Sequence, residues 1–134
     1  DRIGYQAAAL RESAGTGTVA DNLVDALTDL FGSVAVAIVA LVIFRDELRA
    51  RLRQTWPTGV PLTTEAATMI ASYLTAERDL GRIAEDAHID TLALTLIGAA
   101  HLLFADRKGT PPRPEAVRNM VTTVLAGVVP EPQP

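Results

Sequence analysis

The stretch from Leu30 to Phe44, LFGSVAVAIVALVIF, is the most hydrophobic part of the chain and contains no charged residue. It is shorter than the ~20 apolar residues that a helix needs to cross a bilayer. Residues 34–37 alternate Val and Ala, which also suits a strand, but the run is longer than most strands and no turn residue follows Ser33 within it. A helix that is apolar on every side must be surrounded by other elements. We therefore expect a central buried helix that lines whatever cavity the protein has.

Glycine and proline clusters divide the rest of the chain into further helices. Thr18 and Asp21 have the spacing of a capping box, so a helix is predicted to begin after Thr18. Trp56-Pro57 ends that helix, because proline lacks an amide hydrogen and disfavours helical geometry in the residue before it. Gly32-Ser33 predicts a kink or a division within it. The helices are expected at about 3–12, 19–56, 63–81, 88–107 and 114–129. With the second one divided, the sequence predicts an all-α bundle of about six helices.

The length and charge of the chain limit its class. At 134 residues it is long enough for one domain with a hydrophobic core. We expect residues 1–130 to form that domain and residues 131–134 to be a flexible tail. The net charge of −4 argues against direct nucleic-acid binding by these residues, because phosphate contacts require a basic surface. The absence of cysteine and of a secretory leader fits a cytoplasmic protein.

No arrangement of residues indicates catalysis. The sequence has no nucleophile elbow, no phosphate-binding loop and no outstanding carboxylate pair, so we expect neither an enzyme nor a cofactor. His88 and His101 lack matching carboxylates, and we expect no metal site. Arg45, Arg49 and Arg53 recur on one helix face, which suits an anionic ligand but is more typical of a solvated, salt-bridged face.

Large apolar side chains of the middle helices are candidates for a ligand pocket. We expect a mostly apolar pocket for a hydrophobic or amphipathic small molecule between the run at 34–44 and the helices after it. His101 could anchor a polar group of this ligand, although a hydrogen-bonded core or interface histidine is the more common role. The candidates, which sequence alone does not separate from core residues, are Phe31, Phe44, Trp56, Met69, Tyr73 and His101.

The last two predicted helices each have a wide apolar face. In residues 89–104 the apolar residues cover about 160° of the helix circumference, against ~100° for an ordinary surface helix. Gly98 and Gly127 permit close approach of a neighbouring helix. Burial within their own domain is one explanation of these faces, and a two-fold four-helix interface is the one we favour. The predicted interface residues are Leu96, Ala100, Leu103, Val117, Val121, Val124 and Val128.

Segments of the C-terminal half resemble a known family. They are Leu80-Gly81-Arg82-Ile83, Leu96-Ile97-Gly98-Ala99, a Pro-rich linker, and the closing Val124-Leu125-Ala126-Gly127-Val128-Val129-Pro130. Together these segments resemble the C-terminal half of TetR-type (tetracycline-repressor-like) transcriptional regulators. The resemblance covers about residues 77–130, and before them it rests on helix order and length.

The resemblance implies a homodimeric effector-binding domain of a ligand-responsive regulator, most often a repressor. The last two helices would form a four-helix bundle with those of the partner. A small molecule among the middle helices would change the spacing of two DNA-reading heads. Operator DNA would be bound only through an N-terminal helix-turn-helix domain, which residues 1–134 do not include. A helical membrane-associated or scaffold protein without a DNA-related function is the alternative.

Overall fold

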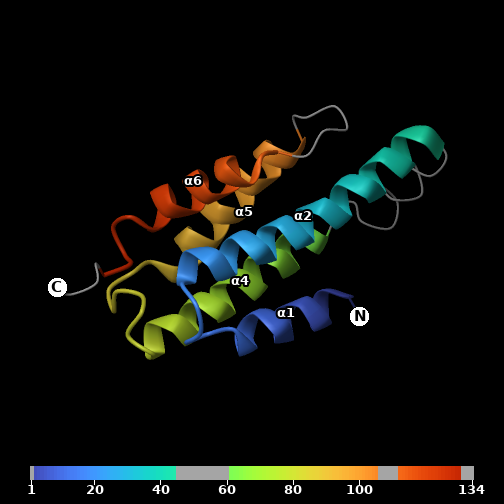
Figure 1. The fold of residues 1–134 in the computed structure, drawn as a ribbon. Coiled ribbons are helices and arrows are strands. Elements are labelled where there is room, and N and C mark those ends of the chain that lie inside the picture. The colour runs from blue at the N-terminus through green and yellow to red at the C-terminus, as the bar shows by residue number, and fades with distance from the viewer. Residues whose placement is uncertain (1, 45–60, 106–111, 131–134) are drawn as a thin grey trace.

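A computed structural model describes residues 2–44, 61–105 and 112–130, and this part of the chain contains five helices and no strand. The helices are α1 (Arg2–Glu12), α2 (Val19–Phe44), α4 (Pro61–Asp79), α5 (Ile89–Ala105) and α6 (Pro114–Leu125). They lie roughly alongside one another as a bundle, with α1 at one side and α6 at the other (Figure 1). The all-α prediction is confirmed. No helix in the described ranges is long and apolar enough to span a membrane.

The second helix differs from the prediction, because α2 continues without a break through Gly32 and Ser33. The expected division there, and with it the count of about six helices, was wrong for the described residues, whereas the alternative of a kink stays a prediction. A glycine inside a helix costs only about 1 kcal/mol relative to alanine. Packing of the buried residues Leu27, Leu30 and Phe31 just before it can offset that cost.

The helix ends follow local signals in the sequence. The Asp21 amide donates a hydrogen bond to the Thr18 hydroxyl at 3.0 Å, which confirms the predicted cap of α2. Gly15 and Gly17 lie in the left-handed region, with φ of 84° and 50°, and allow the sharp connection between α1 and α2. Pro114 is the first residue of α6, where its missing amide hydrogen has no consequence.

The core lies between α2, α4, α5 and α6, and α1 covers one side of it. Helix α2 packs against α1, α5 and α6, and α4 packs against α1 and α5. The side chains of residues 33–44 lie outside the described part, so the expected surroundings of the apolar run stay a prediction. The largest hydrophobic side chains that are almost completely buried are Leu23, Leu27, Ile70, Tyr73, Leu74, Ile83, Leu96, Val117 and Val121.

Candidate functional site

A Schellman motif ends α4 and brings two charged side chains together. Gly81 has φ of 82°, the Gly81 amide donates to the Arg78 carbonyl at 3.0 Å, and the Arg82 amide donates to the Glu77 carbonyl at 2.9 Å. The chain therefore reverses at Gly81, and Arg82 lies beside the last turn of the helix. Its guanidinium forms an ion pair with the Glu77 carboxylate at 2.9 Å.

The Glu77 carboxylate is completely buried and accepts four hydrogen bonds. They come from the Tyr73 hydroxyl at 2.5 Å, from Nε and Nη2 of Arg82 at 3.1 and 2.9 Å, and from the Gly15 amide at 2.9 Å. Burial by itself raises the pKa of Glu77, but the bonds from Arg82, Tyr73 and Gly15 outweigh burial and hold this pKa below its usual value of 4.5. Burial and the bond to Glu77 raise the pKa of Tyr73. Glu77 is therefore ionised and Tyr73 neutral at pH 7.

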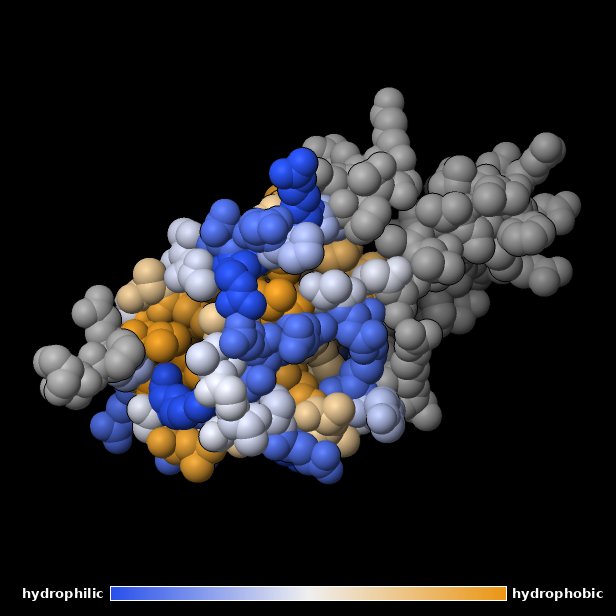
Figure 2. Space-filling model, in the orientation of Figure 1, coloured by the Kyte–Doolittle hydropathy of each residue, from blue (hydrophilic) through white to orange (hydrophobic). Residues whose placement is uncertain are grey.

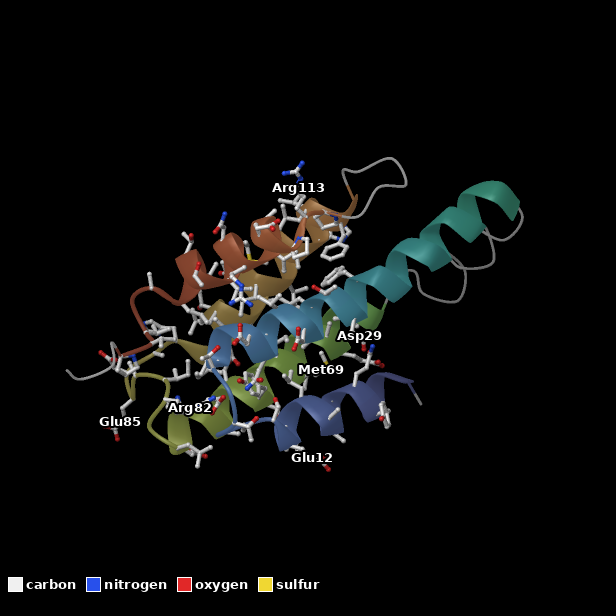
Figure 3. All side chains as sticks on the ribbon, in the orientation of Figure 1. Glu12, Asp29, Met69, Arg82, Glu85 and Arg113 are labelled. Carbon is white, nitrogen blue, oxygen red and sulfur yellow. The ribbon has the colours of Figure 1, made fainter. Side chains whose placement is uncertain are left out.

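Arg82 and Asn22 connect this carboxylate to the loop between α1 and α2. Nη1 of Arg82 donates to the Gly17 carbonyl and Nη2 to the Thr16 carbonyl, both at 2.8 Å, and Arg82 lies next to this loop in Figure 3. The side-chain amide of Asn22 donates to the Tyr73 hydroxyl and the Thr16 carbonyl, each at 3.0 Å. We refer to Asn22, Tyr73, Glu77 and Arg82 as the Glu77 network.

The Glu77 network is a structural connection. Within the described ranges, every buried side-chain nitrogen or oxygen has a hydrogen-bond partner. Buried groups satisfied in this way hold segments in place, and here they attach the loop at residues 13–18 to the end of α4. From the sequence, Tyr73 was a candidate for either a pocket wall or the core, and Glu77 was not singled out. One available signal was that Glu77 continues the buried stripe of Ile70, Tyr73 and Leu74 on α4.

The predicted pocket residues that the structure describes lie in different surroundings. Phe31 is buried, with its ring centre 6.4 Å from that of His101 and 5.8 Å from that of Phe104. Met69 is buried at the floor of one groove, and exposed His101 lines another. The Phe44 side chain, Trp56 and the arginines at 45, 49 and 53 lie outside the described residues.

The first groove, which we call the α1 groove, lies between α1, α2 and α4 and has a volume of about 310 Å³. Leu10 and Met69 form an apolar floor, and Gln6, Asp25 and Asp29 supply polar groups. Gln6 donates a hydrogen bond to Asp29 at 2.8 Å across the groove. Figure 3 shows Met69 on α4 and Asp29 on α2, both near α1. Asn22 also lines the groove, so the α1 groove shares a wall with the Glu77 network.

The second groove, the α4–α5 groove, is larger and has a volume of about 750 Å³. Small side chains make up much of its surface, and most of its lining atoms are apolar. The polar residues at its sides include Asp90 and His101. Its lining residues are Ala67, Thr68, Ala71, Asp90, Ala93, Leu94, Ile97, Gly98 and His101.

The predicted interface residues fall into two groups. Leu96, Ala100, Val117 and Val121 are at most 1% exposed in the single chain, so the core covers them and they have no surface to offer a partner in this conformation. The arc predicted for an interface is, at these four positions, the side that faces the chain's own core. Leu103, Val124 and Val128 are half-buried, and Val124 and Val128 pack against this core.

A different face of α5 carries the exposed hydrophobic residues. Leu94 is 65% exposed and Leu102 is 70% exposed, although leucine is usually buried. Gly98 lies midway between them and is also exposed. On the face of the molecule seen in Figure 2, hydrophobic residues appear as patches between polar ones. Helix α5 thus has a buried apolar side and, at Leu94, Gly98 and Leu102, an outer apolar face.

Comparison with known proteins gives no relative: no family model, no curated protein and no solved structure matches this chain.

Proposed function

We propose that this chain is the effector-binding and dimerisation domain of a TetR-type, ligand-responsive transcriptional regulator. Operator DNA would be bound by a helix-turn-helix segment outside residues 1–134, because the net charge of −4 makes these residues poor phosphate ligands. The observation that carries the proposal is the outer face of α5, where Leu94 and Leu102 remain more than half exposed. In this proposal the two exposed leucines on that helix face are part of a larger protein-protein contact.

The first experiment measures self-association. Sedimentation equilibrium of residues 1–134 at micromolar concentration is expected to give a dimer. Leu102→Glu should give a monomer, because the partner would bury the added carboxylate without a counter-charge. Leu80→Glu is the matched control: Leu80 is 58% exposed but lies after the end of α4, away from the outer face of α5, and its variant should remain dimeric. A monomeric unmodified protein would contradict the dimerisation part of the proposal.

The α1 groove supports the effector part of the proposal. Its volume lies at the lower end of the roughly 300–1,000 Å³ range of small-molecule sites, and it combines an apolar floor with a few polar groups. Asp25, which is exposed at the side of the groove, favours an effector with a hydrogen-bond donor or a positive charge over an anionic one. We therefore propose a small amphipathic molecule of that kind.

Thermal denaturation with a panel of small alkyl and aromatic amines, alcohols and carboxylates tests this effector class. Amines or alcohols should raise the melting temperature, because a ligand that binds only the folded state stabilises it by mass action. Ala9→Phe should abolish the effect by filling the α1 groove, which Ala9 lines. Ala8→Phe, at the neighbouring exposed position outside the groove, should not. Stabilisation by carboxylates alone, or an unchanged effect in Ala9→Phe, would contradict the proposed site.

A further inference from the structure

Helices α1 and α2 run antiparallel along two sides of the α1 groove. The side-chain amide of Asn22 donates a hydrogen bond to the Ser13 carbonyl at 3.1 Å, and Gln6 donates to Asp29 at 2.8 Å. Position 22 of α2 therefore lies opposite position 13, and position 29 lies opposite position 6. These two bonds join the sides of the groove at points that are seven residues apart, which is about 10 Å of helix.

Between these two bonds the groove contains a carboxylate without a partner. By the same pairing, Asp25 lies opposite Leu10, next to Ala9, whose methyl group is too short to cross the groove. Asp25 is exposed, and none of the side chains that the structure describes forms an ion pair or a hydrogen bond with it. No lysine or arginine is among the described residues that line the groove. The middle of the groove is therefore negatively charged.

Asp25 is also the middle one of three aspartates on one face of α2. Asp21, Asp25 and Asp29 follow one another at intervals of four residues, a spacing at which like charges repel. Arg118 of α6 forms an ion pair with Asp21, and Gln6 of α1 donates to Asp29, so both outer aspartates have a partner on a neighbouring helix. A cation beside Asp25 would reduce the repulsion that remains.

The ring of Tyr5 is a second group that suits a cation. Tyr5 lines the groove from α1, about one helical turn before Ala9, and is 77% exposed. The face of an aromatic ring attracts a cation that lies within about 6 Å of the ring centre. Leu10 and Met69 form the floor and can accept hydrocarbon. The groove thus combines a carboxylate and an aromatic ring with an apolar surface.

We infer that the effector bound in the α1 groove is an organic cation, whose ammonium group lies between the Asp25 carboxylate and the Tyr5 ring. This inference rests on the proposed function and specifies the effector class and the residues that select it. The volume of about 310 Å³ sets its size at about ten non-hydrogen atoms, because a water molecule occupies about 30 Å³ in the liquid. The hydrocarbon part of the effector lies on Leu10 and Met69.

Titration of the full chain, followed by NMR, tests the charge with three probes of similar length. Hexyltrimethylammonium is positively charged and has no hydrogen-bond donor, hexan-1-ol has a donor and no charge, and hexanoate is an anion. The cation should bind about three- to tenfold more tightly than hexan-1-ol, and hexanoate should bind most weakly. Added salt should reduce the preference for the cation, because the carboxylate is exposed to water.

Variants of the two selecting residues test their roles. Asp25→Asn should weaken binding of hexyltrimethylammonium about threefold and leave binding of hexan-1-ol unchanged. Asp86→Asn is the matched control, because it removes the same charge from an exposed position outside the groove. Tyr5→Leu should also weaken binding of the cation about threefold, whereas Tyr5→Phe, which keeps the aromatic face, should not.

The possible failures of this experiment are distinguishable. If the cation and hexan-1-ol bind equally and Ala9→Phe abolishes both, the inference is overturned and the proposed effector site stands. If none of the three probes binds, both the inference and the effector part of the proposed function are overturned. Equal losses in Asp25→Asn and Asp86→Asn would show that the net charge of the chain attracts the cation, and would overturn the role of Asp25.

Discussion

Replacing Glu77 with glutamine preserves the shape of the side chain and removes the only fully buried charge among the described residues. One carboxylate oxygen becomes an NH₂ group, which does not accept hydrogen bonds. In the unmodified protein each carboxylate oxygen of Glu77 accepts two hydrogen bonds, so the glutamine loses two of them whichever way its amide turns. A hydrogen bond to a charged group contributes about 1.5–3 kcal/mol. The Arg82 side chain is 28% exposed and water screens it in part, so we use the lower value and expect a loss of about 3 kcal/mol.

Urea and thermal denaturation of the Glu77→Gln variant measure this loss. The free energy of unfolding should fall by about 3 kcal/mol, and the melting temperature by roughly 10 °C for a chain of this size. Glu65→Gln is the matched control, because Glu65 is an exposed glutamate on the same helix. Its effect should remain within about 0.5 kcal/mol. If Glu77→Gln unfolds within about 1 kcal/mol of the unmodified protein, the energetic role assigned to the Glu77 network is refuted.

The pH dependence gives an independent test of the same network. The pKa of Glu77 in the folded protein is below its usual value of 4.5, so the folded state binds fewer protons than the unfolded state between these two values. The stabilisation is therefore complete above about pH 4.5 and is lost as the pH falls through the folded pKa. Because glutamine does not titrate, the stability difference between the two proteins should shrink in that window. A difference that stays constant down to about pH 3 would contradict the ionised state.

Other substitutions test the fold by chemical denaturation. Gly81→Ala should lower the free energy of unfolding by about 1–2 kcal/mol, because alanine is strained at φ of 82°. Gly32→Ala should raise it by about 0.5–1 kcal/mol, because Gly32 lies inside α2 with open space around it. Equal effects of the two substitutions would refute the left-handed conformation of Gly81. Leu23→Ala should cost about 2–5 kcal/mol, since Leu23 is completely buried, and a loss under 1 kcal/mol would place it outside the core. Asp21→Asn should leave the unfolding midpoint nearly unchanged, because its ion pair with Arg118 is exposed to water, and a large shift would show that this pair is more than a surface contact.

Most of the helix boundaries could be predicted from the sequence, because the signals that set them are local. The Thr18 cap, the glycines of the first connection and Pro114 each act within one helical turn, and the structure has helix ends at these points. The division predicted at Gly32-Ser33 was wrong because the effect of a glycine on a helix is not decided locally. A single glycine lowers helix propensity, but packing around the helix decides whether the helix breaks.

The site was harder to predict because a periodic pattern shows that a face is apolar without showing what covers it. The arc that contains Leu96 and Ala100 was assigned to a partner, and the structure places both residues in the core. Leu94 and Leu102, which lie outside that arc, turned out to be exposed. Glu77 was not predicted as a site residue for a related reason. The role of a glutamate within an apolar stripe can be predicted only when its hydrogen-bond partners are known. One of these partners, Gly15, is distant in sequence.

The two proposed roles belong to different parts of the bundle and are therefore separable by mutation. The α1 groove is bounded by α1, α2 and α4, and its inner wall includes Asn22, which the Glu77 network fixes in place. A wall that is already ordered loses little conformational freedom when a ligand binds, so the network favours effector binding without contributing a direct contact from Glu77. The outer face of α5 has no residue in that network. Loss of the Glu77 charge should accordingly weaken effector binding in the α1 groove and leave self-association intact. A charge at position 102 should disrupt self-association and leave effector binding intact. Among the described helices, α2 and α4 both line the α1 groove and pack against α5, so an effector could influence the dimer through them.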